Sequence, residues 1–162
     1  MEISKKMAEA FNSQIQAEFQ SAYLYLSMAA WFEEGNFPGF SHWMKKQYEE
    51  EVEHAMKMFD SLAERGGRVE LQAIMAPQKD WTDAIAVFKD TLEHERVVTK
   101  LIYKLVDMAK EEKDYASIEF LHWYVKEQVE EESTASGILA NLEKIGDSVV
   151  GLLAFDRELG NR

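Results

Sequence analysis

The most constraining feature of the sequence is the length of its segments without helix-breaking residues. The chain has two prolines, Pro38 and Pro77, and most of its eight glycines stand in clusters. Between these breakers, apolar residues recur every three or four positions, which is the spacing of one face of an α-helix. The apolar stripes run through residues 7–32, 44–62, 85–105 and 118–142. We therefore predict an all-α fold with four helices of roughly 27–32 residues, each about 40–48 Å long.

Turn and capping residues set the predicted helix boundaries. Residues 35–39, Gly-Asn-Phe-Pro-Gly, end the first helix, and the glycine pair at 66–67 ends the second. Thr82 and Asp114 are the predicted N-caps of the third and fourth helices. A shorter fifth helix is expected from about Asp147 to Leu159.

The lengths of the connections constrain how the helices are arranged. The first and second predicted helices are joined by about five residues and the third and fourth by about three, so each pair forms an antiparallel hairpin. The middle connection, near residues 67–81, has about 15 residues and spans roughly 50 Å when fully extended. A crossover along the whole bundle is favoured, although a loop folded at one end of an up-down-up-down bundle fits the same length.

Length and charge limit the classes of protein to which the chain can belong. Its 162 residues are enough for one domain, which we expect to span residues 1–162. The 30 acidic residues exceed the 18 basic ones, and the formal charge of -12 has the wrong sign for binding nucleic acid. A hydrophobic content of 46% excludes a disordered acidic chain. We therefore expect a folded acidic protein with no nucleic-acid partner.

The absence of cysteine limits the chemistry further. It excludes disulfides, thiolate zinc sites, iron–sulfur clusters and thiol nucleophiles, so a bound metal must be held by oxygen and imidazole. Charged residues interrupt the first ten positions, unlike in a signal peptide, and no apolar stretch is long enough to cross a membrane. We expect a cytoplasmic protein with no membrane contact.

Each apolar stripe is interrupted by a polar residue at a position where a core residue is expected. The interrupting residues are Glu18, Glu51, Glu95, Gln128 and Glu131. Counted from the predicted turns, they lie about 12–17 residues from a helix end, which places them at one level near the middle of the bundle. Four helices are therefore expected to point polar side chains into the core at the same depth.

A histidine completes this polar layer. Glu51-x-x-His54 places a carboxylate and an imidazole on one helical face, one turn apart. Carboxylates that are buried without a partner are costly, and no lysine or arginine lies on the inner stripes at this level. Two divalent cations would balance the four glutamates, and oxygen ligands with one imidazole suit iron, manganese or zinc. The sequence thus predicts a two-metal centre inside one bundle.

Simpler interpretations apply to several polar residues. A single glutamate in an apolar stripe is usually a surface residue, so the prediction depends on four glutamates at one depth. Glu119-x-x-His122 has the same spacing but lies near the start of the fourth predicted helix, and we interpret it as non-ligating. His42 and His94 are expected to face solvent. The eight methionines are scattered over several helices and are interpreted as core residues.

With these residues placed, the chain resembles the non-haem ferritins of bacteria and archaea over essentially its whole length. The motifs that carry the resemblance are Ser21-Ala22-Tyr23-Leu24-Tyr25-Leu26-Ser27-Met28, Glu50-Glu51-x-x-His54-Ala55-Met56-Lys57, Glu64-Arg65-Gly66-Gly67 and Phe120-Leu121-x-Trp123-Tyr124-Val125-x-Glu127-Gln128. The resemblance implies a ferritin-like four-helix bundle with one long crossover and a short fifth helix. Ferritin-like proteins are known di-iron four-helix bundles. The roles given below for individual residues are therefore what the resemblance implies, and the spacing of the residues alone does not establish them.

The resemblance implies a role for each residue of the layer. The ligands of the two irons would be Glu18, Glu51, His54, Glu95 and Glu131, with Glu51 as the bridge. Gln128 would lie beside the pair as a catalytic residue, and Tyr25 matches a tyrosine with a proposed electron-donor role. A core aromatic whose hydroxyl bonds a carboxylate is the alternative for Tyr25. A third iron site would use Glu50, Glu127, Glu130 and Glu131, of which periodicity alone assigns the first three to a solvated acidic face.

The function that the resemblance implies is iron storage with ferroxidase activity. Two Fe(II) ions would be oxidised by O2 or peroxide, and the Fe(III) product would be stored as mineral in a hollow cage of about 24 subunits. Haem is not expected, because Val52 stands where bacterioferritins carry their haem-binding methionine. One alternative is a di-metal oxidase or peroxidase without storage, and another is a structural bundle whose buried acids are paired or protonated.

Overall fold

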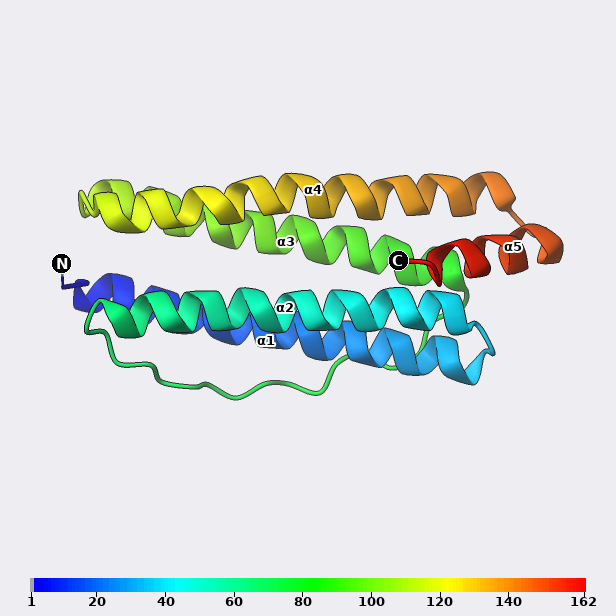
Figure 1. Ribbon diagram of the computed structural model, residues 1–162, viewed down its shortest axis with the longest axis horizontal. Coiled ribbons are helices and arrows are strands. Elements are labelled where there is room, and N and C mark those ends of the chain that lie inside the picture. Colours follow the sequence, from blue (N-terminus) through cyan, green and yellow to red (C-terminus); the bar gives the residue numbers. More distant parts are fainter. Residues whose placement is uncertain (1) are drawn as a thin grey trace.

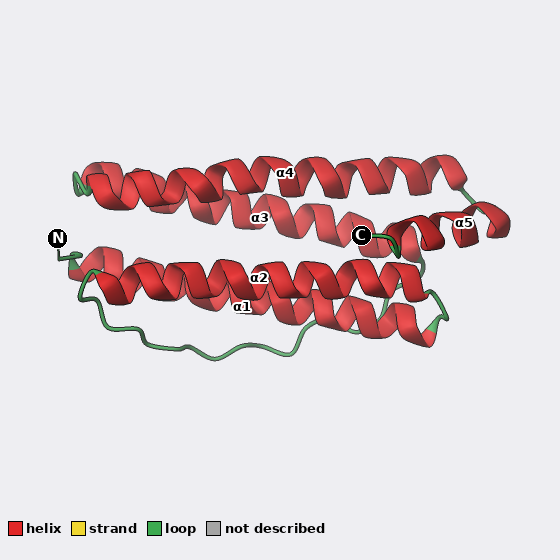
Figure 2. Cartoon of the chain, in the orientation of Figure 1, coloured by secondary structure: helices red, strands yellow, loops and turns green. Residues whose placement is uncertain are grey.

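The computed structural model describes residues 2–162; Met1, which the predicted domain includes, lies outside the described residues. Helices are the only regular elements in this part of the chain (Figure 2). They are α1 (Lys5–Glu34), α2 (Pro38–Glu64), α3 (Ala84–Glu111), α4 (Tyr115–Ile145) and α5 (Val149–Leu159). The four long helices have 30, 27, 28 and 31 residues, so the predicted all-α bundle with a short fifth helix is confirmed. None of the helices within residues 2–162 is long and apolar enough to cross a membrane.

The predicted crossover is also confirmed. α1 and α2 form one hairpin, and α3 and α4 form another (Figure 1). The connection that joins the two hairpins, residues 65–83, runs along the length of the bundle on the outer side of α1 and α2 (Figure 1). This connection has no regular structure, and one face of α1 holds its backbone carbonyls by hydrogen bonds of 2.6–3.2 Å. The donors are Asn12, Gln16, Gln20 and Ser27. The first three are four residues apart and therefore lie above one another on the helix surface.

One of the two predicted helix caps is correct. Asp114 caps α4 as predicted, because its carboxylate accepts a hydrogen bond from the Ser117 N–H at 3.1 Å. The prediction of Thr82 as the cap of α3 is wrong. Asp83 has the extended backbone of an N-cap residue, and its carboxylate accepts from the Ala86 N–H at 2.7 Å. Since the cap must accept from an N–H near the start of the first turn, α3 begins one residue later than predicted.

α5 is anchored on the start of α2. It begins at Val149, two residues later than predicted, and folds back so that its C-terminal end points toward the middle of the bundle (Figure 1). The contact is close, because a Cβ atom at Gly39 would lie 1.6 Å from the Asp156 carbonyl oxygen. The Asp156 carboxylate also accepts from the Phe40 N–H at 2.9 Å. It thereby satisfies a free N–H at the start of α2, where the N-cap residue makes no side-chain bond.

The core consists of two apolar clusters, one toward each end of the bundle. One contains Tyr25, Met44, Phe88 and Ile138, and the other contains Ile15, Met58, Val98 and Tyr124. Each long helix contributes to both clusters and passes from one to the other through buried polar residues. The polar layer predicted from the sequence therefore lies between two apolar clusters, which hold the helices together on either side of it.

Candidate metal centre

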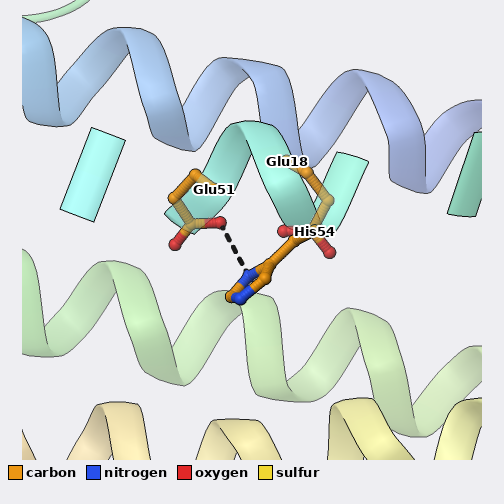
Figure 3. A group of neighbouring side chains, drawn as sticks. All are labelled: Glu18, Glu51 and His54. Atoms are coloured by element: carbon orange, nitrogen blue, oxygen red, sulfur yellow. Dashed lines mark ion pairs between the residues drawn. The ribbon is translucent and has the colours of Figure 1, made fainter. Parts of the chain in front are cut away.

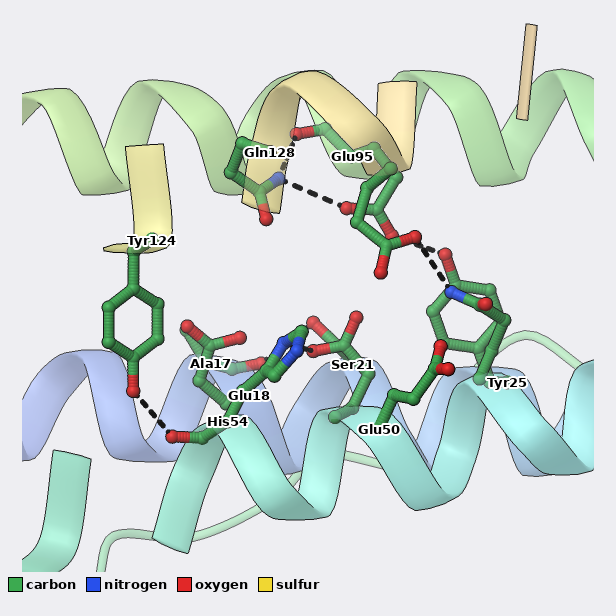
Figure 4. A network of polar contacts seen from close by, with 12 residues as sticks. Ala17, Glu18, Ser21, Tyr25, Glu50, His54, Glu95, Tyr124 and Gln128 are labelled. Atoms are coloured by element: carbon green, nitrogen blue, oxygen red, sulfur yellow. Dashed lines mark hydrogen bonds and ion pairs between the residues drawn. The ribbon is translucent and has the colours of Figure 1, made fainter. Parts of the chain in front are cut away.

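The five residues predicted to interrupt the apolar stripes are buried in one place, together with His54. Their exposed fractions are 1% for Glu18, 2% for Glu51, 6% for His54, 0% for Glu95, 4% for Gln128 and 7% for Glu131. Figure 4 shows Glu18, His54, Glu95 and Gln128 pointing toward one another across the bundle. The structure thus brings together side chains from all four long helices, at the level where the sequence pattern places them.

Glu18, Glu51 and His54 form the first group of ligand atoms. One ligand atom from each lies within 4.8 Å of the others (Figure 3). The Glu51 Oε2 atom is 3.4 Å from the His54 Nδ1 atom, yet it is buried and accepts no hydrogen bond. A carboxylate oxygen of this kind is costly unless a cation or a proton compensates it. Burial and the neighbouring carboxylates of Glu95 and Glu18 accordingly raise the pKa of Glu51 well above its usual value.

Glu95 is held from both sides by neutral donors. The Tyr25 hydroxyl donates to Glu95 Oε1, and the Gln128 amide nitrogen donates to Glu95 Oε2 at 3.1 Å (Figure 4). Burial raises the pKa of Glu95 despite these two bonds, which lower it. Burial and the carboxylates around Tyr25 likewise raise its pKa well above 10, so the phenol stays protonated and donates. The structural alternative for Tyr25, a core aromatic bonded to a carboxylate, describes its position.

Glu131 faces the same centre from α4. Its Oε2 atom accepts from the Gln47 amide nitrogen at 2.9 Å, which leaves its other oxygen free for a ligand role. Burial, followed by the Glu95 carboxylate, raises the pKa of Glu131 to about 8. On Glu18, the Gln14 amide nitrogen bonds one carboxylate oxygen at 2.9 Å. Amides and a phenol, rather than charged side chains, therefore orient the carboxylates.

The donor set fits hard divalent cations. Within residues 2–162, no lysine or arginine forms an ion pair with Glu18, Glu51, Glu95 or Glu131, although Arg162 pairs with the adjacent Glu50. Four carboxylates without a cationic partner call for about four positive charges, which two divalent ions supply. Oxygen ligands with one imidazole suit iron among the transition metals.

The residues predicted for a third site are only partly assembled. Ligand atoms of His54, Glu127 and Glu131 lie within 4.8 Å of one another, beside a surface cavity of about 370 Å³. Glu50 also lines this cavity and accepts from Arg162. The Glu130 side chain is 63% exposed and lies 3.7 Å from Lys126, outside this group.

The remaining histidines differ from one another. His122 is exposed and lies 3.5 Å from Glu119, apart from the centre, as expected for the non-ligating pair. The expectation that His94 faces solvent is wrong. Its Nε2 atom lies 2.7 Å from the Ser21 hydroxyl, where α1 covers it, and burial lowers its pKa to about 4. His42 is half-buried and contacts the backbone carbonyl of Arg162 at 3.0 Å, so it too is partly covered.

Three residues beside the centre were not predicted from the sequence. Gln47 is completely buried and lies in the apolar stripe of α2, three residues from Met44 and four from Glu51, so the same stripe argument would have found it. The Tyr124 hydroxyl donates to the His54 carbonyl at 2.7 Å. In the sequence, Tyr124 cannot be distinguished from an ordinary core aromatic residue. Arg162 bonds Gln47 and Glu50, and no periodicity or motif in the sequence indicates these contacts.

Comparison with known proteins identifies the family. A model of the ferritin-like domain matches residues 8–145. The chain is 46% identical to a bacterial non-haem ferritin from Bacteroides fragilis, with 99% of both chains covered. It is 38% identical to one from Staphylococcus aureus, over 99% of this chain and 96% of the relative. A crystal structure of an open-pore ferritin from the archaeon Archaeoglobus fulgidus superposes with a TM-score of 0.98 at 53% identity, covering 99% of each chain. The chain belongs to the ferritin family, and within it to the non-haem ferritins of bacteria and archaea.

Proposed function

We propose that two Fe(II) ions bind between the four long helices and are oxidised there. Glu18, Glu51 and His54 would bind the first ion, and Glu95 and Glu131 would bind the second, with Glu51 as the bridge. The observation that carries this assignment is the buried Glu51 Oε2 atom, which accepts no hydrogen bond and lies beside three other carboxylates. Membership of the non-haem ferritins makes the protein an iron-storage protein with a ferroxidase site.

The ligand set favours oxidation of the bound iron. Carboxylates are hard ligands that bind Fe(III) better than Fe(II), so they lower the reduction potential of the pair. Each Fe(II) gives up one electron to the oxidant, which we propose to be O2 or hydrogen peroxide. Glu131 offers a single oxygen that Gln47 does not bond, and such a sparse site lets the Fe(III) product leave.

Tyr25 and Gln128 are proposed to act around the iron pair. The Tyr25 hydroxyl is directly bonded to Glu95, so a phenol and a proposed iron ligand are in contact, as an electron-donor role requires. The Gln128 amide nitrogen is occupied by Glu95 and Thr99. Its carbonyl oxygen is the part of the amide left to accept from water or an oxygen species. We further propose a third iron position near Glu127 and Glu131, with Glu50 adjacent and the exposed Glu130 at its outer edge.

Storage requires a cavity that a single bundle does not have. We therefore propose that residues 1–162 form one ferritin-like domain and that 24 copies assemble into a cage in the cytoplasm. The apolar residues Val149, Val150 and Leu153 on α5 are 71%, 79% and 45% exposed, which supports their burial against other subunits. Size-exclusion chromatography tests the assembly, since a cage elutes at roughly 450 kDa for chains of 18.7 kDa. A monomer or small oligomer would instead favour a di-metal oxidase without storage.

The chain contains its own control for the proposed ligands. Glu51→Ala and His54→Ala should abolish rapid oxidation of Fe(II), measured by stopped-flow absorbance, and leave the cage assembled. Glu119→Ala and His122→Ala remove a pair with identical spacing that lies on the surface, and they should oxidise iron at the parent rate. Parent-like oxidation by Glu51→Ala, or equal losses in both pairs of variants, would contradict the assignment.

A further inference from the structure

The chain beyond α5 places a guanidinium group next to the metal centre. Because α5 folds back along the bundle, the end of the chain lies beside the first half of α2 (Figure 1). The Arg162 Nη1 atom donates to Gln47 Oε1, and its Nη2 atom donates to Glu50 Oε2 at 2.6 Å. The guanidinium also lies 4.8 Å from the centre of the Trp43 ring, so three residues of α2 hold it in place.

The contact with Gln47 determines which way that amide faces. Arginine has only donors, so Gln47 must present its carbonyl oxygen to Arg162. Its amide nitrogen then points the other way and donates to Glu131 Oε2 at 2.9 Å. Gln47 is completely buried, so without Arg162 its carbonyl oxygen would lose this donor. The guanidinium and the Glu131 carboxylate are therefore joined through one oriented amide.

We propose that Arg162 is a positioning residue for the second iron site, acting through Gln47 to hold the Glu131 carboxylate in its ligating orientation. This inference rests on the proposed function, in which Glu131 is a ligand of the second iron. Arg162 contacts Glu50 but none of the proposed ligands of the first two irons. It would therefore act on the Glu131 carboxylate through the Gln47 amide and not by direct contact. The packing of α5 against α2 would then help to determine the geometry of the second iron site.

Binding of Zn2+, which is not oxidised, tests this role in the metal-free protein. Calorimetric titration of the parent should show two tight sites per subunit. Arg162→Met keeps the apolar stem against Trp43 and removes the two donors; it should weaken one site roughly three- to tenfold and leave the other unchanged. Arg157→Met is the matched control, because Arg157 is exposed on α5 and forms no ion pair within residues 2–162. That control should bind Zn2+ like the parent.

A double-mutant cycle tests the route through Gln47. If the amide transmits the effect, Arg162→Met should weaken Zn2+ binding no further in a Gln47→Met background. In ferroxidase assays, Arg162→Met should raise the Fe(II) concentration needed for half-maximal rate and leave the saturated rate near that of the parent. Parent-like Zn2+ affinity of Arg162→Met, equal weakening of both sites, or additive losses in the double variant would overturn the inference. A parent without tight Zn2+ sites would instead overturn the proposed function, so the two failures are distinguishable.

Discussion

In the metal-free protein, the buried carboxyl group of Glu131 is expected to make stability fall as the pH rises. Burial and the Glu95 carboxylate raise the pKa of Glu131 from 4.5 to about 8. Between these two values the folded protein holds a proton that the unfolded chain has released, so each rise in pH favours unfolding. The stabilising effect is fully present below about pH 4.5 and is lost as the pH approaches 8.

The size of the effect follows from the difference between the two pKa values. One pKa unit corresponds to about 1.4 kcal/mol, so raising the pH from 5 to 8 lowers the contribution of Glu131 to the free energy of unfolding by about 3–4 kcal/mol. Glu131→Gln has nearly the same shape and does not titrate, so it should lose none of this. Over that pH range, the Tm of the parent should fall by about 6–16 °C more than that of the variant.

The measurement compares Tm values at pH 5 and pH 8 after chelation of all metal. Glu130→Gln is the matched control, since it is the same substitution one position earlier on α4, at a side chain that is 63% exposed. It should follow the parent. Added Zn2+ should reduce the pH dependence of the parent, because a bound cation keeps the carboxylates ionised. If the parent and Glu131→Gln lose stability in parallel, the burial cost assigned to Glu131 is refuted.

Three further substitutions test parts of the fold and the site. Gly39→Ala places a methyl group 1.6 Å from the Asp156 carbonyl oxygen, so it should displace α5 and cost about 3 kcal/mol or more, measured as a loss in Tm. Asp114→Ala removes the cap of α4 and the half-buried pair with Arg65 at 2.8 Å, and calorimetry should show a Tm lower by about 4–12 °C. Tyr25→Phe removes a donor from a buried carboxylate and should weaken Zn2+ binding about tenfold by titration calorimetry, with unchanged binding as the contradicting result.

The helices and their order were predictable because each signal is local. Apolar stripes fix the helical faces, and short connections fix the hairpins, whatever the angle between helices. The cap of α3 was misplaced by one residue because Thr82 and Asp83 are both good caps, and their backbone conformation decides between them. Asn12, Gln16 and Gln20 hold the crossover, and their spacing is readable only once that segment is known to lie against α1.

The buried layer was predictable because a carboxylate in an apolar stripe is conspicuous. The contacts of Arg162 were not, since they depend on the angle at which α5 returns to α2. His94 was misjudged because its neighbour Glu95 marks the inner face, while the covering of position 94 comes from Ser21 on another helix. Patterns within one helix thus locate inward positions, whereas contacts at the edges between helices require the packed structure.

The way in which the proposed ligands are held suggests why no lysine or arginine of residues 2–162 forms an ion pair with them. A lysine or arginine beside the carboxylates would neutralise them in the metal-free protein, and an incoming cation would then have to displace it. The donors to Glu18, Glu95 and Glu131 are amides and a phenol, which orient the carboxylate oxygens without adding a positive charge to the layer. Glu51 Oε2, the buried oxygen without any donor, belongs to the proposed bridging ligand. The two apolar clusters on either side of the layer stabilise the fold against the cost of these buried carboxylates, and a bound divalent cation would lower that cost.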